Sequence, residues 1–262
     1  MEDDPDWVEQ LRVQIRGRKD PWVVLEGRHA VEAAVAGWWD LAGILATEGS
    51  GWEPPEWSGL EVLRKPSDYL DAVAGYRFHR GVLGLAKLPD ETEDVAGLMA
   101  EVEADALVVI CPRLADASNA GAIIRNAAAL GAKAVIFGKE GVSPFERKSV
   151  RASSGALFRI PVRVADGGQI LRCLKTAGFQ MIGAAVGEGT RRIDRAEIEP
   201  GRVAVIVGSE EEGLGSFWEA ACDELTHLPM DSGMDSLNAA AASAIFLWEI
   251  RRRRQESVER PD

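Results

Sequence analysis

The chain has 262 residues, 46% of them hydrophobic, which is enough for a full buried core in one large or two smaller domains. Its formal net charge of -12 argues against a general nucleic-acid binder, because neutralising many phosphates needs a basic surface. The longest apolar runs are too short and too rich in alanine to span a bilayer, and the acidic N-terminus differs from a secretory signal, so we expect a cytoplasmic protein.

Residues 1–88 are expected to form a small α/β domain. Residues 23–31 lead into an Ala-rich helix, residues 41–45 are typical of a strand, and residues 76–85 close the unit. Trp38 and Trp39 have rings that can stack on nucleic-acid bases, but packing of the helix end against the core is the interpretation that we favour. Residues 89–104 are acidic, with a few apolar positions at helical spacing, and are predicted to be a linker with one or two helical turns.

Residues 105–262 alternate short apolar strands with helical patterns. The predicted strands, hydrophobic on both faces, are residues 107–110, 134–137, 180–183 and 203–207, and the predicted helices are residues 119–130, 170–177 and 215–222. This alternation predicts an α/β fold with a doubly wound parallel sheet. Because ligands of such sheets bind beyond the carboxyl ends of the strands, we expect the functional site in the segments that follow them.

Three polar segments follow strands, at residues 113–126, 208–214 and 230–238. In the first, Asn119 offers an amide that can hold a hydroxyl group, and Arg125 offers a guanidinium that can bind a phosphate oxygen at two points. An Asn that caps a helix and an Arg on its surface explain the same pair without any function. The spacing alone leaves both interpretations open.

The second segment carries three successive carboxylates, Glu210, Glu211 and Glu212. A Walker-type loop needs Lys followed by Ser or Thr at its end, and a dinucleotide fingerprint needs three spaced glycines, so neither fits. A cationic or neutral ligand suits this acidity better, and S-adenosylmethionine carries both a sulfonium and an ammonium group. The third segment ends in Ser236-Leu237-Asn238, where Ser236 is expected to cap the Ala-rich helix that follows.

In order and spacing, these three segments resemble the signature motifs of the SpoU (TrmH) branch of the SPOUT RNA 2′-O-ribose methyltransferases. The resemblance covers roughly the second half of the chain, including the Ala-rich helix. Gly27-Arg28-His29 and His79-Arg80-Gly81 resemble, more weakly, the ends of the ribosomal-protein-like substrate-binding domain that precedes the catalytic domain in many members. The resemblance implies a C-terminal trefoil knot, S-adenosylmethionine as cofactor, an RNA substrate and a homodimer whose interface completes the sites.

The resemblance also assigns roles to individual residues of this chain. The implied catalytic residues are Arg125, Asn119, Glu210, Asn238 and Ser236; the implied cofactor-binding residues are Gly208, Leu228, Leu237, Met230 and Ser236; and the implied substrate-binding residues are Arg28, His29, Arg80 and Arg151. Glu211 and Glu212 are expected to face solvent. His227, beside the expected pocket, is of a type that can act as a general base, but the family pattern places no catalytic histidine there.

The cysteines and histidines do not suggest a metal site. Cys111, Cys173 and Cys222 are odd in number, far apart and without clustered histidines, so neither a disulfide framework nor zinc binding is indicated. We expect three buried thiols and no metal.

The expected activity is methylation of a ribose 2′-hydroxyl in structured RNA, with ribosomal RNA favoured over transfer RNA because of the N-terminal domain. The alternatives are a transfer-RNA ribose methyltransferase, a non-catalytic RNA-binding protein that keeps the fold, and an enzyme that methylates a different RNA atom. With this net charge, RNA contact must come from local basic clusters, each of which is also typical of a solvated face; they are Arg147, Lys148 and Arg151, then Arg159 and Arg163, then Arg77 and Arg80.

Overall fold

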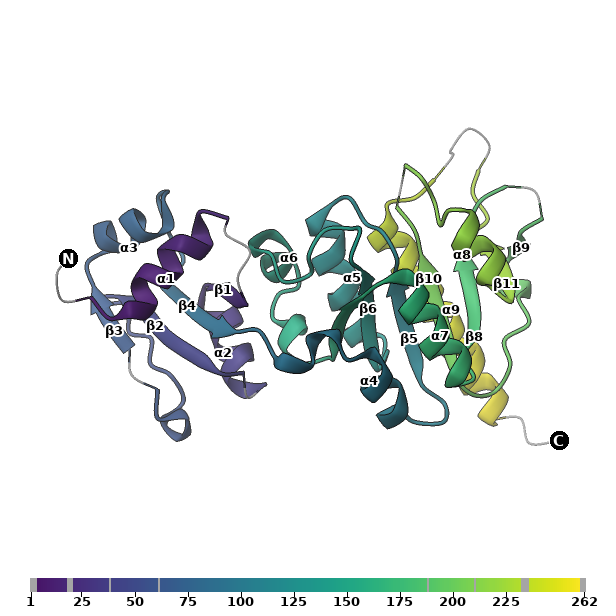
Figure 1. Cartoon of the computed structure of the whole chain (residues 1–262), viewed down its shortest axis with the longest axis horizontal. Helices are drawn as coiled ribbons and strands as arrows, with labels where there is room; N and C mark the ends of the chain where they lie inside the picture. The colour runs from purple at the N-terminus through teal and green to yellow at the C-terminus, as the bar shows by residue number, and fades with distance from the viewer. Residues whose placement is uncertain are drawn as a thin grey trace.

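The structure of the protein is a computed structural model, which describes residues 4–17, 21–37, 39–60, 62–187, 189–209, 211–231 and 236–259. Figure 1 shows two α/β units side by side along the longest axis, the N-terminal one in purple and blue and the C-terminal one in teal to yellow. Each unit is built on its own β-sheet.

The N-terminal unit is a four-stranded mixed sheet with helices on both faces. Its elements are α1 (Asp6–Ile15), β1 (Trp22–Glu26), α2 (Arg28–Ala36), β2 (Leu41–Thr47), β3 (Val62–Lys65), α3 (Ser67–Ala74) and β4 (Val82–Lys87), and the strand order is β1-β4-β2-β3. The strands alternate: Val23 and Leu25 pack with α2 on one face, and Val24 packs with α1 and α3 on the other. Trp39 meets the Phe158 ring edge-on, with ring centroids 4.9 Å apart, which confirms the packing role; Trp38 lies outside the described residues.

The C-terminal unit is a seven-stranded sheet in which every pairing is parallel. Its strands are β5 (Leu107–Cys111), β6 (Ala134–Gly138), β7 (Val162–Ala165), β8 (Gln180–Ala184), β9 (Arg191–Arg192), β10 (Val203–Val207) and β11 (Glu224–His227), in the order β7-β6-β5-β10-β8-β11-β9. The central strands β5, β6 and β10 are buried along their whole length. The doubly wound parallel sheet is therefore confirmed, while the trefoil knot stays a prediction.

Helices cover both faces of this sheet. They are α4 (Val95–Glu101), α5 (Ala117–Ala129), α6 (Arg147–Ala152), α7 (Gly167–Thr176), α8 (Ser216–Ala221) and α9 (Ala239–Glu259). α5 and α9 share one core with the N-terminal unit, and α4, α7 and α8 pack in a second core on the opposite face. The strand order reverses between β5 and β10, so the loops after these two strands meet at one edge of the sheet.

Two helices begin at residues that differ from those expected. α5 begins at Ala117, because the Asp116 carboxylate accepts a hydrogen bond from the Ser118 backbone N–H at 2.5 Å and caps the helix; this bond lowers the pKa of Asp116. Asn119 is therefore inside the helix. α9 begins at Ala239, and its cap is Asn238, since the Asn238 side-chain oxygen accepts from the backbone N–H groups of Ala240 and Ala241 at 3.0 and 3.3 Å. The expectation that Ser236 caps this helix is wrong.

The two units are joined by a buried carboxylate. The Glu26 side chain, only 2% exposed at the end of β1, accepts hydrogen bonds from Arg147 Nε at 2.7 Å and from Tyr76 Oη at 3.1 Å. Arg151 Nη1 lies 3.5 Å from the same carboxylate. A buried carboxylate needs such partners to offset its lost hydration, so the contact fixes α6 of the second unit against β1 of the first.

The expectation that all three cysteines are buried is wrong. All three are free, but only Cys111 is buried, whereas Cys173 and Cys222 are partly exposed. In addition, none of the helices in the described part of the chain has the length and apolar character needed to cross a membrane.

Candidate active site

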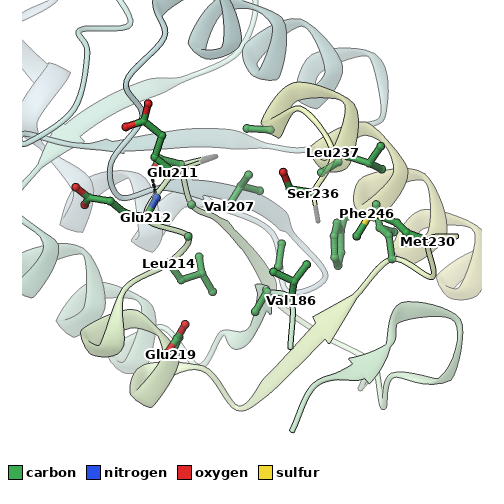
Figure 2. Close-up of a pocket in the computed structure, with 18 residues that line it drawn as sticks. Val186, Val207, Glu211, Glu212, Leu214, Glu219, Met230, Ser236, Leu237 and Phe246 are labelled. Atoms are coloured by element: carbon green, nitrogen blue, oxygen red, sulfur yellow. Dashed lines mark hydrogen bonds between the residues drawn. The ribbon is translucent and has the colours of Figure 1, made fainter. Parts of the chain in front are cut away.

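A cavity of about 440 Å³ lies at the carboxyl ends of β8 and β10, under the segment that leads into α9. Figure 2 shows Val207, Leu214 and Val186 lining it on one side and Ser236, Leu237, Met230 and Phe246 on the other. Its volume is within the range of pockets that hold small molecules. The five residues expected to bind a cofactor all line this cavity: Gly208, Leu228, Met230, Ser236 and Leu237.

The loop after β10 has a tight backbone that depends on glycine. Gly208 lies so close to the returning chain that an added Cβ would be 2.0 Å from the Gly213 carbonyl oxygen. Ser209 and Gly213 exchange two backbone hydrogen bonds, at 3.1 and 3.0 Å, which hold the loop closed. The Glu212 carboxylate accepts from Arg113 Nη1 at 2.5 Å, and this bond ties the loop to the chain that leaves β5.

The cavity has apolar walls and an acidic edge. Glu211, Glu212 and Glu219 are among its lining residues, together with the apolar side chains drawn in Figure 2. Of these carboxylates, Glu212 is paired with Arg113 and is about half exposed, so the expectation that it simply faces solvent is incomplete. Apolar walls favour an aromatic or aliphatic moiety, and carboxylates favour a cation. A cofactor that joins an adenine ring to a sulfonium and an ammonium group has the matching chemistry.

Two asparagines connect the first and third polar segments. Asn238 Nδ2 donates to Asn119 Oδ1 at 2.9 Å, and the opposite end of the Asn238 amide caps α9. Two residues after Asn238, in the first turn of α9, the Ala240 carbonyl accepts from Asn126 Nδ2 at 2.8 Å. Two residues that are 119 positions apart in the sequence are thus in direct contact beside Ser236 and Leu237 of the cavity wall.

Arg125 takes no part in the contact between Asn119 and Asn238 and has a different partner. Its guanidinium Nη1 donates to the Ser154 hydroxyl at 3.3 Å, and both side chains are exposed. Six residues separate Asn119 from Arg125 on α5, which is a rotation of about 600°, so the two side chains leave different faces of the helix. Within the described residues, the cavity lining does not include Arg125.

The packing under α5 explains the glycine in this segment. A Cβ on Gly121 would lie 2.2 Å from the Ser149 carbonyl oxygen and 2.6 Å from the Ala152 Cβ. Only glycine lets α5 approach α6 this closely. The short distance between the two helices brings the turn after α6, which holds Ser154, within reach of Arg125.

The expected substrate residues of the N-terminal unit lie together. Gly27-Arg28-His29 follows β1 and His79-Arg80-Gly81 precedes β4, and these two strands pair antiparallel. The Arg80 side chain packs over Gly27, and the His29 side chain is 94% exposed. The Arg28 guanidinium makes a hydrogen bond inside the N-terminal unit, since its Nη2 donates to the Ser50 carbonyl at 2.7 Å.

Three further residues considered from the sequence are Arg151, Glu210 and His227, and each has a different position. Arg151 is paired with Glu26 at the junction of the two units, although 42% of its side chain stays exposed. Glu210 lies outside the described residues. His227 is bonded through Nδ1 to the Thr190 hydroxyl at 2.8 Å and is not among the described lining residues of the cavity.

Several lining residues were not expected from the sequence. They are Ala184, Ala185, Val186, Leu214, Glu219, Ala239, Ala242 and Phe246. Two signals in the sequence could have identified them. Residues 184–186 follow a predicted strand, which is where ligands of parallel sheets bind. Ala239, Ala242 and Phe246 recur at helical spacing on α9.

Comparisons with known proteins agree with this architecture. A protein of Mycolicibacterium smegmatis named as an uncharacterized tRNA/rRNA methyltransferase is 32% identical over 201 residues, which are 75% of this chain and 63% of that relative. The 23S rRNA (guanosine-2′-O-)-methyltransferase RlmB of Xanthomonas campestris pv. campestris is 34% identical, over 75% of this chain and 79% of the relative. The chain covers 63%, less than two thirds, of the Mycolicibacterium smegmatis relative and of a further relative from Mycobacterium sp. (strain KMS).

The fold also has a close counterpart among solved structures. The SpoU methyltransferase AviRb from Streptomyces viridochromogenes, in complex with the cofactor AdoMet, has a TM-score of 0.81 at 23% identity, over 96% of this chain and 100% of that chain. The model of the SpoU rRNA Methylase family matches residues 106–248, which is more than half of the chain and contains all three polar segments. The resemblance expected from the motifs is confirmed, and the chain belongs to the SpoU rRNA Methylase family.

Proposed function

We propose that the protein transfers a methyl group from S-adenosylmethionine to a ribose 2′-hydroxyl of RNA. The observation that carries this proposal is the convergence of the three polar segments at one edge of the parallel sheet, around a cavity with apolar walls and acidic residues. Family membership adds support, as does the AdoMet bound to AviRb, which shares this fold.

The residues around the cavity divide between two tasks. Gly208, Leu228, Met230 and Leu237 would hold the cofactor, largely through backbone groups and apolar contacts. When bound, S-adenosylmethionine supplies an electrophilic methyl group. The chain's own residues must then place a ribose oxygen in line with that group and make the oxygen nucleophilic.

Arg125 is the residue that we assign to the second task. A guanidinium is a poor proton acceptor, because it stays protonated throughout the pH range in which proteins function. Its role would be to stabilise negative charge on the 2′-oxygen and to hold the adjoining phosphate with its planar fork. Asn119 and Asn238, bonded to each other, would orient the ribose or its phosphate at the cavity mouth together with Ser236 and Glu210.

Ribosomal RNA is the substrate that we favour. We assign an RNA-binding domain to residues 1–88, a linker to residues 89–104 and a catalytic domain to residues 105–262. The N-terminal unit carries an exposed basic cluster, which consists of Arg28, His29 and Arg80. The relative RlmB is named for 23S rRNA, which agrees with this choice.

A transfer assay tests the proposed function directly. With labelled S-adenosylmethionine, we expect the label to enter bulk ribosomal RNA and much less to enter bulk transfer RNA. Once the labelled nucleotide has been located in the RNA, an oligonucleotide covering it should accept no label when its target ribose lacks the 2′-hydroxyl, since the atom that is modified is then absent. Label retained by the deoxy substrate would indicate methylation of another atom, and no label in any RNA would favour a non-catalytic binding protein.

We also propose that the protein is a homodimer whose interface includes α9. Ile245 and Trp248, which are 43% and 54% exposed, lie about one turn apart on this helix, and Leu237, which is 38% exposed, lies two residues before the helix begins. Exposed large apolar side chains in a stripe are typical of protein contact surfaces. Because Arg125 does not line the described cavity of its own protomer, a second protomer that brings its Arg125 to that cavity would complete the site.

Mixing two impaired variants, assayed at an S-adenosylmethionine concentration well below the Kd of Gly208→Ala, tests this arrangement. We expect Arg125→Ala and Gly208→Ala proteins, unfolded and refolded together in equal amounts, to regain about a quarter of wild-type transfer, because half of the dimers then contain one intact composite site. Each variant refolded alone is the control. If mixed samples stay inactive, the two residues act within one protomer. A Trp248→Glu variant should sediment as a monomer, and one that remains dimeric would place the interface elsewhere.

A further inference from the structure

Ser154 has an unusual backbone conformation. Of the non-glycine residues that the structure describes, it is the one with a positive φ, 49°. This left-handed region is unfavourable for residues with a Cβ, and serine is not among the types enriched there. The Ser154 side chain is exposed, so core packing does not explain why glycine is absent from this position.

The turn that contains Ser154 is fixed from both sides. Ser153 is fully buried and its hydroxyl donates to the Val150 carbonyl at 2.7 Å, which anchors the turn to α6. On the other side, a Cβ on Gly155 would lie 2.8 Å from the Ala33 Cβ and 3.3 Å from the His29 carbonyl oxygen, so this glycine packs tightly on α2. A strained residue persists only where the surrounding structure determines its conformation, and here both units of the protein do so.

The one side-chain partner of Ser154 in the described structure is Arg125, whose Nη1 donates to its hydroxyl at 3.3 Å. Arginine has many rotamers, and an exposed arginine samples them unless a bond restricts it. We propose that Ser154 is a positioning residue, which holds the Arg125 guanidinium in the orientation needed at the ribose; this inference rests on the proposed function of Arg125.

The same turn connects Arg125 to the expected RNA-binding cluster. Gly155 packs on the backbone of His29, next to Arg28 and across the strand ends from Arg80. The orientation of the guanidinium therefore depends on how the N-terminal unit packs against α6. The contact between Glu26 and Arg147 fixes this packing. In this proposal the strained serine has a function that glycine would lack, because glycine, which would fit the backbone better, has no side-chain oxygen for Arg125.

Substitution of Ser154 separates this role from a structural one. Ser154→Gly relieves the backbone strain but removes the acceptor, so we expect the melting temperature to stay the same or to rise by about 2 °C while kcat falls about tenfold. The KM for RNA and the Kd for S-adenosylmethionine should stay within about twofold of wild type, because neither pocket is altered. Ser154→Asn keeps a side-chain oxygen and tolerates the left-handed backbone, so it should retain at least about half of kcat.

Two controls sharpen the result. Gly178→Ser places a serine at a φ of +71° in an open turn far from the site, so it should lower the melting temperature and leave kcat unchanged. In an Arg125→Lys background, Ser154→Gly should cause no further loss, because a residue that acts through Arg125 has nothing left to orient. Wild-type kcat in Ser154→Gly, equal losses in the Gly and Asn variants, or additive losses in the double variant would overturn the proposal.

A measurement on the protein without cofactor or RNA keeps this inference independent of the proposed function. We expect ¹⁵N relaxation at Arg125 Nε to show a more mobile side chain in Ser154→Gly than in wild type or in Ser154→Asn. Unchanged mobility in Ser154→Gly overturns the positioning role even if the wild-type chain transfers no methyl group. By contrast, full transfer by Arg125→Ala would show that the proposed function of Arg125 is wrong, with the Ser154 contact unaffected.

Discussion

Arg125→Ala is expected to lower methyl transfer to RNA by about 100- to 1,000-fold, which is the usual effect of removing a group that stabilises charge in a transition state. The affinity for S-adenosylmethionine should stay almost unchanged, because the described residues that line the cavity do not include Arg125. Calorimetric titration with S-adenosylmethionine and a transfer assay under single-turnover conditions measure the two quantities separately.

Arg125→Lys should remain strongly impaired. An ammonium keeps the positive charge, but it lacks the planar fork that contacts two oxygens at once. Recovery of most of the activity in Arg125→Lys would mean that charge alone is needed at this position. Near-normal transfer by Arg125→Ala would contradict the role that we give to this residue, and with it the strongest link between the chain and ribose chemistry.

Gly208→Ala is expected to weaken the binding of S-adenosylmethionine by at least about tenfold. The added methyl group would lie 2.0 Å from the Gly213 carbonyl oxygen and 2.6 Å from the Leu214 backbone nitrogen, so the loop must move and the cavity wall moves with it. Isothermal titration with S-adenosylmethionine and with its demethylated product, S-adenosylhomocysteine, gives the change in Kd.

A matched alanine elsewhere controls for the substitution itself. At Gly168, in the first turn of α7, an added Cβ meets only the tip of the flexible Arg172 side chain, at 3.5 Å. Gly168→Ala should therefore bind both ligands as wild type does. If Gly208→Ala also binds both ligands normally, then the cavity between β10 and α9 is not the cofactor site.

The local pattern of the sequence was sufficient to predict the central strands of the C-terminal unit. The strands β5, β6, β8 and β10 match the predicted ranges to within one residue, because strands buried on both faces consist of short apolar runs that are visible without tertiary information. The carboxyl ends of these predicted strands also indicated the edge of the sheet at which the polar segments lie. The five expected cofactor-binding residues line one cavity for this reason.

Elements at the periphery could not be predicted in this way. β9 consists of the exposed residues Arg191–Arg192, and β11 has a mixed composition, so neither carries an apolar run. In the N-terminal unit, β3 is only partly buried along its length and was missed together with α1 and α3. Such strands exist because a neighbouring strand offers its backbone groups, and that neighbour is distant in the sequence.

The helix starts and the partners of the site residues were decided by the tertiary structure. Spacing alone allowed Asn119 and Ser236 to be caps, whereas Asp116 and Asn238 cap the two helices. Sequence spacing relates residues along one helix, but the contacts of Asn119 with Asn238 and of Arg125 with Ser154 span 119 and 29 positions. The sequence by itself therefore determined which groups are present at the edge of the sheet, and only the packing of distant segments decided which of them touch.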